Sequence, residues 1–150
     1  MWASDSSSLN VSSEADAREP MIAIGGGVPH VTWRETLGAT TNVYVAHWTG
    51  TAWVLDGGSL SNDPSKPIAS PFIAFSGATP YVAWRETTGG AFQTFVKHLH
   101  DSTWVQNGGS LNVNATVSAF APALGFDGAN PYAAWAEAAG SLYSIQVKRL

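Results

Sequence analysis

The sequence predicts an all-β fold built from three copies of one unit, and three observations lead to this prediction. A seven-residue motif with tryptophan at its fifth position occurs three times and places Trp33, Trp84 and Trp135 at intervals of 51 residues. Short apolar runs alternate with glycine or proline about every ten residues, which is typical of strands and not of helices. The period continues without insertion, so the units span residues 1–51, 52–102 and 103–150.

The middle unit shows the expected elements in order. It opens with a short apolar strand that Asp56-Gly57-Gly58 closes as a turn, and a connection rich in Ser, Asn, Asp and Pro follows. Three further strands come next, separated by turns that contain Gly77 and Gly89-Gly90. The four strands are expected at residues 52–55, 71–75, 81–86 and 92–99.

Four short strands, three tight turns and one long connection per unit predict a blade of a β-propeller. The connection would carry the chain from the outer strand of one blade to the inner strand of the next. Because propellers typically have about four to eight blades, three blades do not surround a channel. We therefore expect two chains to close a six-bladed ring as a homodimer, with a nine-bladed homotrimer as the alternative. The residues expected to pair across the subunit boundary are Trp2, Val147 and Leu150.

Composition excludes several classes of function. The net charge is −4, and the seven Lys and Arg residues form no run, which argues against nucleic-acid binding. The absence of cysteine excludes disulfides, thiolate nucleophiles and Cys-based metal sites. No apolar stretch is long enough for a membrane span, and the first residues lack the pattern of a secretory leader. We expect a soluble protein without a cofactor.

The third strand of each unit carries the candidate ligand-binding residues. A tryptophan, an arginine and a carboxylate are the groups from which sugar sites are made. The candidates are Trp33, Arg34, Glu35, Trp84, Arg85, Glu86, Trp135 and Glu137. Strand alternation places Arg85 on the face opposite Trp84 and Glu86, and Ala136 interrupts the set in the third unit. Repetition favours packing for the tryptophans and hydrogen bonding to turn amides for the glutamates.

Histidines and acidic residues do not predict a metal site or a catalytic centre. The four histidines include no His-x-x-x-His pair, and although His98 and His100 lie two residues apart, exposed polar positions explain them better. No residue set stands out from the repeat in the asymmetric way that catalysis requires. The expectation from these residues is a protein that is not an enzyme and holds no metal.

The motif at residues 81–86, the Gly-Gly-Ser-Leu segments at 57–60 and 108–111, and the edge tryptophans resemble bacterial β-propeller repeats of the sialidase-like and kelch-like kind. The gapless period also resembles engineered propeller fragments that self-assemble. This resemblance implies a non-catalytic scaffold that closes a ring by strand exchange between chains. The alternative is a carbohydrate-binding propeller with sites between blades, similar in plan to small fucose-binding lectins.

Overall fold

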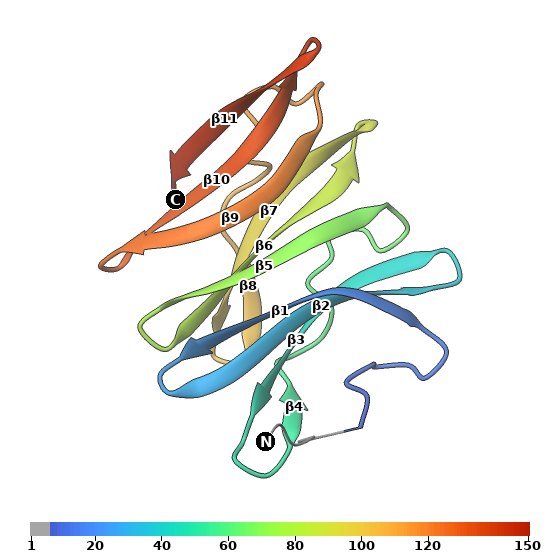
Figure 1. Cartoon of the computed structure of the whole chain (residues 1–150), viewed down its shortest axis with the longest axis vertical. Helices are drawn as coiled ribbons and strands as arrows, with labels where there is room; N and C mark the ends of the chain where they lie inside the picture. Colours follow the sequence, from blue (N-terminus) through green and yellow to red (C-terminus); the bar gives the residue numbers. More distant parts are fainter. Residues whose placement is uncertain (1–6) are drawn as a thin grey trace.

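The computed structural model describes residues 7–150, and within them it contains eleven strands and no helix (Figure 1). No helix long and apolar enough to cross a membrane occurs in this part of the chain. The strands form three antiparallel sheets that are stacked in chain order along the long axis of the molecule. The expectation of an all-β fold is therefore confirmed.

Each sheet is a meander in which strands that follow one another in the chain are hydrogen-bonded neighbours. The first sheet contains β1 (Asp16–Gly25), β2 (Val28–Leu37), β3 (Thr40–Trp48) and β4 (Trp53–Leu55). The second contains β5 (Ile68–Ser76), β6 (Thr79–Thr88), β7 (Ala91–His100) and β8 (Thr103–Gln106). The third contains β9 (Ala119–Asp127), β10 (Asn130–Ala139) and β11 (Leu142–Arg149).

Glycine is required where the first hairpin turns. Gly26 and Gly27 form the two-residue loop between β1 and β2, with φ values of 58° and 80°. This is the left-handed region that a type I′ turn needs at both central positions, and it is costly for other residues. Gly25, just before the turn, is required for a second reason: a Cβ atom there would lie 2.0 Å from the Phe75 ring of the neighbouring sheet. The sequence thus fixes both the turn and the close contact between two sheets.

The core lies between the sheets and not within one of them. One cluster joins Val43 and Val45 of the first sheet to Ile73 and Trp84 of the second. Another cluster joins the opposite face of the second sheet to the third and contains Ala83, Val96, Leu124, Ala133 and Trp135. The middle sheet is therefore buried on both faces, and apolar burial between blades supplies the main stabilising contribution.

The two end sheets leave opposite faces open, the first sheet the face that carries Ile22 and the third sheet the face that carries Val147. Ile22 is 61% exposed, whereas its counterpart Ile73 in the second sheet is 1% exposed. Val147 is likewise 61% exposed, whereas its counterpart Val96 is fully buried. The outer edge of β11 has no paired strand in residues 7–150, and Trp2, expected to pair there, lies outside the described residues. Homodimer and homotrimer closure therefore stay predictions, as do the assembly roles of Trp2, Val147 and Leu150.

The inner strands begin earlier than the sequence predicted. The strand expected at 71–75 begins at Ile68, before Pro71, because the pairing of β5 with β6 shifts register between Ala69 and Phe72. A β-bulge of this kind accommodates a proline, which has no N–H to donate to the ladder. These bulges position the candidate site.

Candidate functional site

Each inner strand bulges at the same place, where a residue in the left-handed conformation precedes a proline. The three residues are Glu19, Ser70 and Ala121, with φ values of 56°, 57° and 47°. Non-glycine residues rarely adopt this conformation, and it costs on the order of 1 to 3 kcal/mol at each position. Strained backbone of this kind gathers at functional sites, and bulges redirect side chains out of the regular alternation. The first strands of neighbouring sheets contact one another, and a hydrogen bond between Glu19 and Ser70 links the first two bulges directly.

The first bulge presents a carboxylate that bridges two sheets. Glu19 Oε2 accepts a hydrogen bond from Arg34 Nε at 3.0 Å and another from the backbone amide of Ser70 at 2.7 Å. The Glu19 side chain remains 41% exposed, and that of Arg34 is 20% exposed. We call Glu19, Arg34, Ser70 and Arg85 the bulge cluster. Its polar groups come from two sheets and stay within reach of solvent.

Arg85 completes the bulge cluster from the second sheet. Its guanidinium lies over the ring of Phe92 at 4.4 Å and near the ring of Phe120 at 5.1 Å. Its Nη1 makes a long hydrogen bond of 3.5 Å to the Ala119 carbonyl, while its buried Nε has no partner among the described residues. Burial lowers the pKa of Arg85, the negative charge of Glu19 raises it, and the charge of Arg34 lowers it. Arg85 pairs with Ala69, the residue before Ser70 in β5, and this register places it beside the second bulge.

The other candidate residues from the third strands are buried in the scaffold. The exposed fractions of Trp33, Trp84, Trp135, Glu35, Glu86 and Glu137 are all 4% or less. Glu86 accepts hydrogen bonds from the amides of Asn62 and Asp63, and Glu137 does so from those of Val113 and Asn114. The glutamates thus hold the long connection against the blade. The structure brings Arg34 and Arg85 to one surface and separates them from the tryptophans and glutamates.

Glu19 was not among the residues singled out from the sequence. Comparison of the three units carries the missing signal, because the residue before the shared proline is Glu in the first unit, Ser in the second and Ala in the third. The backbone at this position is strained in all three units, but the side chain differs in each. The position is therefore one where side-chain chemistry has diverged. A pattern of residues shared by all three units does not reveal this position.

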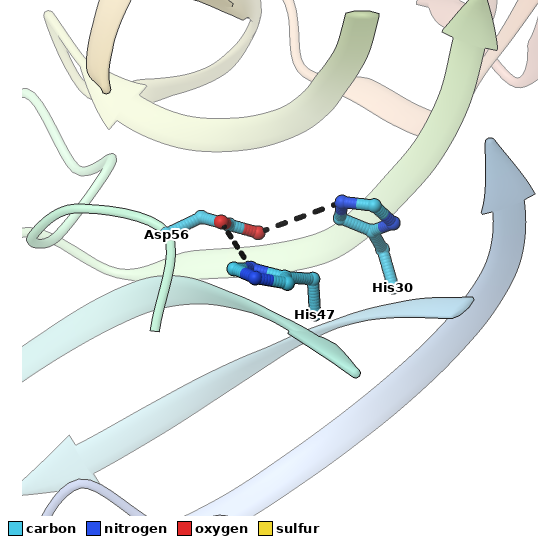
Figure 2. Close-up of side chains that lie close together, drawn as sticks. All are labelled: His30, His47 and Asp56. Atoms are coloured by element: carbon cyan, nitrogen blue, oxygen red, sulfur yellow. Dashed lines mark hydrogen bonds and ion pairs between the residues drawn. The ribbon is translucent and has the colours of Figure 1, made fainter. Parts of the chain in front are cut away.

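A second polar group lies at the opposite end of the first sheet. His30 in β2, His47 in β3 and Asp56 after β4 point toward one another (Figure 2). His47 Nδ1 and Asp56 Oδ1 are 2.6 Å apart, and His30 Nε2 and Asp56 Oδ2 are 3.8 Å apart. One ligand atom from each residue lies within 4.8 Å of the others. The sequence predicted no metal site, and these three residues form no spacing motif in it.

Comparison with known proteins gives the fold a name. No family model and no curated protein matches the sequence. Among solved structures, the chain is similar to an α-L-arabinofuranosidase from Lactobacillus brevis, with 9% identity and a TM-score of 0.54. It is also similar to an exo-1,5-α-L-arabinanase from a bovine ruminal metagenomic library, with 12% identity and a TM-score of 0.54. A third match is the native arabinanase of Bacillus subtilis, with 16% identity and a TM-score of 0.52.

These likenesses extend over most of this chain and only part of the matched proteins. Each covers 89% of this chain, but 52%, 52% and 50% of the respective neighbour. The chain therefore spans about half the length of these structures. At such low identity the likeness establishes the fold alone, which is β-propeller-like. The number of blades and the closure of the ring stay predictions.

The comparison corrects the expected function. The solved structures that share the fold are arabinanases and an arabinofuranosidase, so the expectation of a non-catalytic self-assembling scaffold is wrong, and so is the expectation that the chain is not an enzyme. The likeness to sialidase-like and kelch-like repeats, and to engineered fragments, is not supported either. The error arose because the repeat was taken to exclude an asymmetric residue set, whereas Glu19 has no acidic counterpart in the other two units. The comparison with known structures identifies this chain as one with a β-propeller-like fold.

Proposed function

We propose that this chain forms the glycan-binding part of a carbohydrate-active β-propeller enzyme, with the bulge cluster as its contact surface. The observation that carries the proposal is the position of Glu19, whose carboxylate bridges Arg34 and the Ser70 amide on a strained, solvent-accessible bulge. The proposal is supported by the solved structures named above, each of which is an arabinanase or an arabinofuranosidase. Arabinose-containing glycans are therefore the first ligand class to test.

The chemistry of the bulge cluster suits a sugar. A carboxylate accepts hydrogen bonds from two neighbouring hydroxyl groups, and a guanidinium donates several in a fixed fork. The rings of Phe92 and Phe120 hold the Arg85 guanidinium by cation–π contact, so its orientation is set before a ligand arrives. A preorganised site loses less conformational entropy on binding than one built from free side chains. Glu19 and Arg85 would thus form a rigid pair of acceptor and donor groups.

Hydrolysis requires more than the bulge cluster provides. Most glycoside hydrolases use a pair of carboxylates on either side of the scissile bond, and the bulge cluster contains the single carboxylate of Glu19. The chain also spans about half the length of the matched enzymes. A second carboxylate would have to come from outside this cluster. Binding and hydrolysis therefore need separate assays.

Isothermal titration calorimetry with arabino-oligosaccharides, and with xylo-oligosaccharides for comparison, tests the proposal. Glu19→Gln removes the charge while retaining the side-chain shape, and Arg85→Lys removes the planar fork; each should weaken binding at least about tenfold, the loss expected for a charge-assisted hydrogen bond. Asp101→Asn, at an exposed turn of the second sheet, is the matched control and should bind like the parent. A flat titration with every sugar, or an unchanged affinity in Glu19→Gln, would contradict the proposal.

A further inference from the structure

Asp56 has a buried carboxylate oxygen that no hydrogen bond satisfies. The residue is 8% exposed, and its Oδ2 makes no hydrogen bond within residues 7–150. Its Oδ1 faces His47 Nδ1, and its backbone carbonyl accepts a hydrogen bond from Trp104 Nε1 in the second sheet at 2.6 Å. A buried carboxylate oxygen without a partner is costly unless a cation or a donor compensates it.

His30 is oriented so that a lone pair faces this oxygen. The Nδ1 atom of His30 lies 3.1 Å from the Val28 carbonyl, which is only an acceptor, so Nδ1 carries the proton. In the neutral ring Nε2 then has a lone pair, and it lies 3.8 Å from Asp56 Oδ2 (Figure 2). A backbone carbonyl that fixes the tautomer in this way is the usual outer partner of a metal-bound histidine. A proton on Nε2 or a bound cation would compensate these two atoms.

The second sheet provides an internal reference for this group. At the positions of His30, His47 and Asp56 it has Tyr81, His98 and Asn107. His98 Nδ1 and Asn107 Oδ1 are 2.8 Å apart, so this contact of strand and turn forms without a carboxylate. Tyr81 stacks on His98 and offers no nitrogen lone pair. The His30 imidazole and the Asp56 carboxylate of the first sheet are therefore not needed for the fold.

The three residues are close together on the scale of a metal site. Metal–nitrogen and metal–oxygen bonds of about 2.0 to 2.2 Å place neighbouring ligand atoms about 3.3 to 3.6 Å apart in a tetrahedral site. The observed 2.6 Å and 3.8 Å lie on either side of this range, so an ion would move His47 away from Asp56 and draw His30 closer. Two imidazoles and one carboxylate favour zinc or another first-row transition metal over calcium and magnesium, which prefer oxygen ligands. The His47 side chain is 31% exposed, which gives an ion and a fourth ligand a route from solvent.

We infer that His30 Nε2, His47 Nδ1 and the carboxylate of Asp56 form a binding site for one divalent transition-metal ion, with zinc as the ion to test. The fourth position would be open to water. The nitrogen that binds the ion must be unprotonated, so with the metal bound a neutral His47 would carry its single proton on Nε2. The site is distinct from the bulge cluster: His30 and Arg34 are four residues apart along β2, a separation of about 13 Å.

The test uses protein without a histidine tag, titrated with zinc and examined by native mass spectrometry and calorimetry. One zinc ion per chain is expected, and calcium should give no binding. The double variant His30→Tyr and Asp56→Asn reproduces the residue types found in the second sheet, so it should fold like the parent and bind zinc at least about tenfold more weakly. His100→Gln alters an exposed histidine elsewhere and should leave binding unchanged.

Two results would overturn the inference. One is the absence of stoichiometric zinc in the parent protein at near-neutral pH. The other is equal zinc affinity in the parent and in the His30→Tyr, Asp56→Asn variant, which would place any bound zinc elsewhere. Cobalt gives an independent readout, because its visible absorption should indicate tetrahedral coordination in the parent and change in the double variant. A glycan-binding assay on the same variant should give the parent affinity, which separates this inference from the proposed function.

Discussion

Replacement of Glu86 should reveal how much its buried carboxylate contributes to stability. The side chain is 1% exposed and accepts three hydrogen bonds, from the amides of Asn62 at 2.9 Å and Asp63 at 2.7 Å and from Trp84 Nε1 at 3.0 Å. Glu86→Ala leaves all three donors without a partner. Hydrogen bonds to a charged group are worth about 1.5 to 3 kcal/mol each, and partial entry of water offsets some of the loss. We expect a decrease of about 4 kcal/mol in the free energy of unfolding.

Glu86→Gln, which keeps the shape of the side chain, should reduce the free energy of unfolding by less than Glu86→Ala does. Glu86→Gln keeps one acceptor oxygen for Asn62 and Trp84, but its NH₂ group then faces the donor of Asp63. The expected loss is about 2 kcal/mol, that of one charge-assisted bond. Glu35 is the matched control, because within residues 7–150 its carboxylate accepts one hydrogen bond, from Val11 at 2.7 Å, and the Nε1 of Trp33 has no partner there. Glu35→Gln should therefore cost less, about 1 kcal/mol.

Urea unfolding followed by tryptophan fluorescence measures these differences. Because small domains are stable by only about 5 to 15 kcal/mol, the loss in Glu86→Ala should be plain in the midpoint. An equal or larger loss in Glu35→Gln than in Glu86→Gln would refute the reasoning, since it would mean that the number of hydrogen bonds does not determine the contribution.

Three further predictions test the bulges, the end faces and one carboxylate. Ala121→Gly should raise the free energy of unfolding by about 0.5 kcal/mol in a urea titration, because glycine relieves the strain of a positive φ; a decrease would contradict this. Ile73→Ala should cost about 3 kcal/mol and Ile22→Ala close to none by the same method, and equal costs would mean that the end face is covered in solution. Hydrogen bonds from Ser65 hold the pKa of Asp63 below its usual value of 3.8. This interaction stabilises the folded state above about pH 4 and is lost as the pH falls through the lowered pKa, and carboxyl NMR titration of Ser65→Ala should show that pKa moving upward.

The repeat predicted the parts of the fold that every unit shares. Positions with tryptophan in all three third strands had to be packing residues, and Trp33, Trp84 and Trp135 are buried. The glutamates two residues later also follow the expectation of hydrogen bonding to backbone amides. These features depend on local alternation and on contacts that recur in each unit, which a sequence period makes visible.

The sites depend on residues in which the units differ, and the period hides them. Glu19 precedes Pro20, whose counterpart Pro71 was predicted to begin a strand, whereas the bulge carries the strand through the proline and turns the Glu19 side chain toward the next sheet. His30, His47 and Asp56 come from three separate segments, and their meeting requires the register of β2, β3 and β4. The spacing of these three residues along the sequence does not reveal that register.

The meander order of the strands also bears on how the chain folds. Every hairpin joins neighbouring segments of the chain, so most backbone pairing forms by closing short loops, which favours rapid formation for a β protein. Each sheet can therefore behave as a cooperative unit that its neighbours stabilise. Hydrogen exchange should be slowest in β6 and β7, because the second sheet is covered on both faces, and faster in β1 and β11. Opening should begin at the two ends and reach the middle blade last.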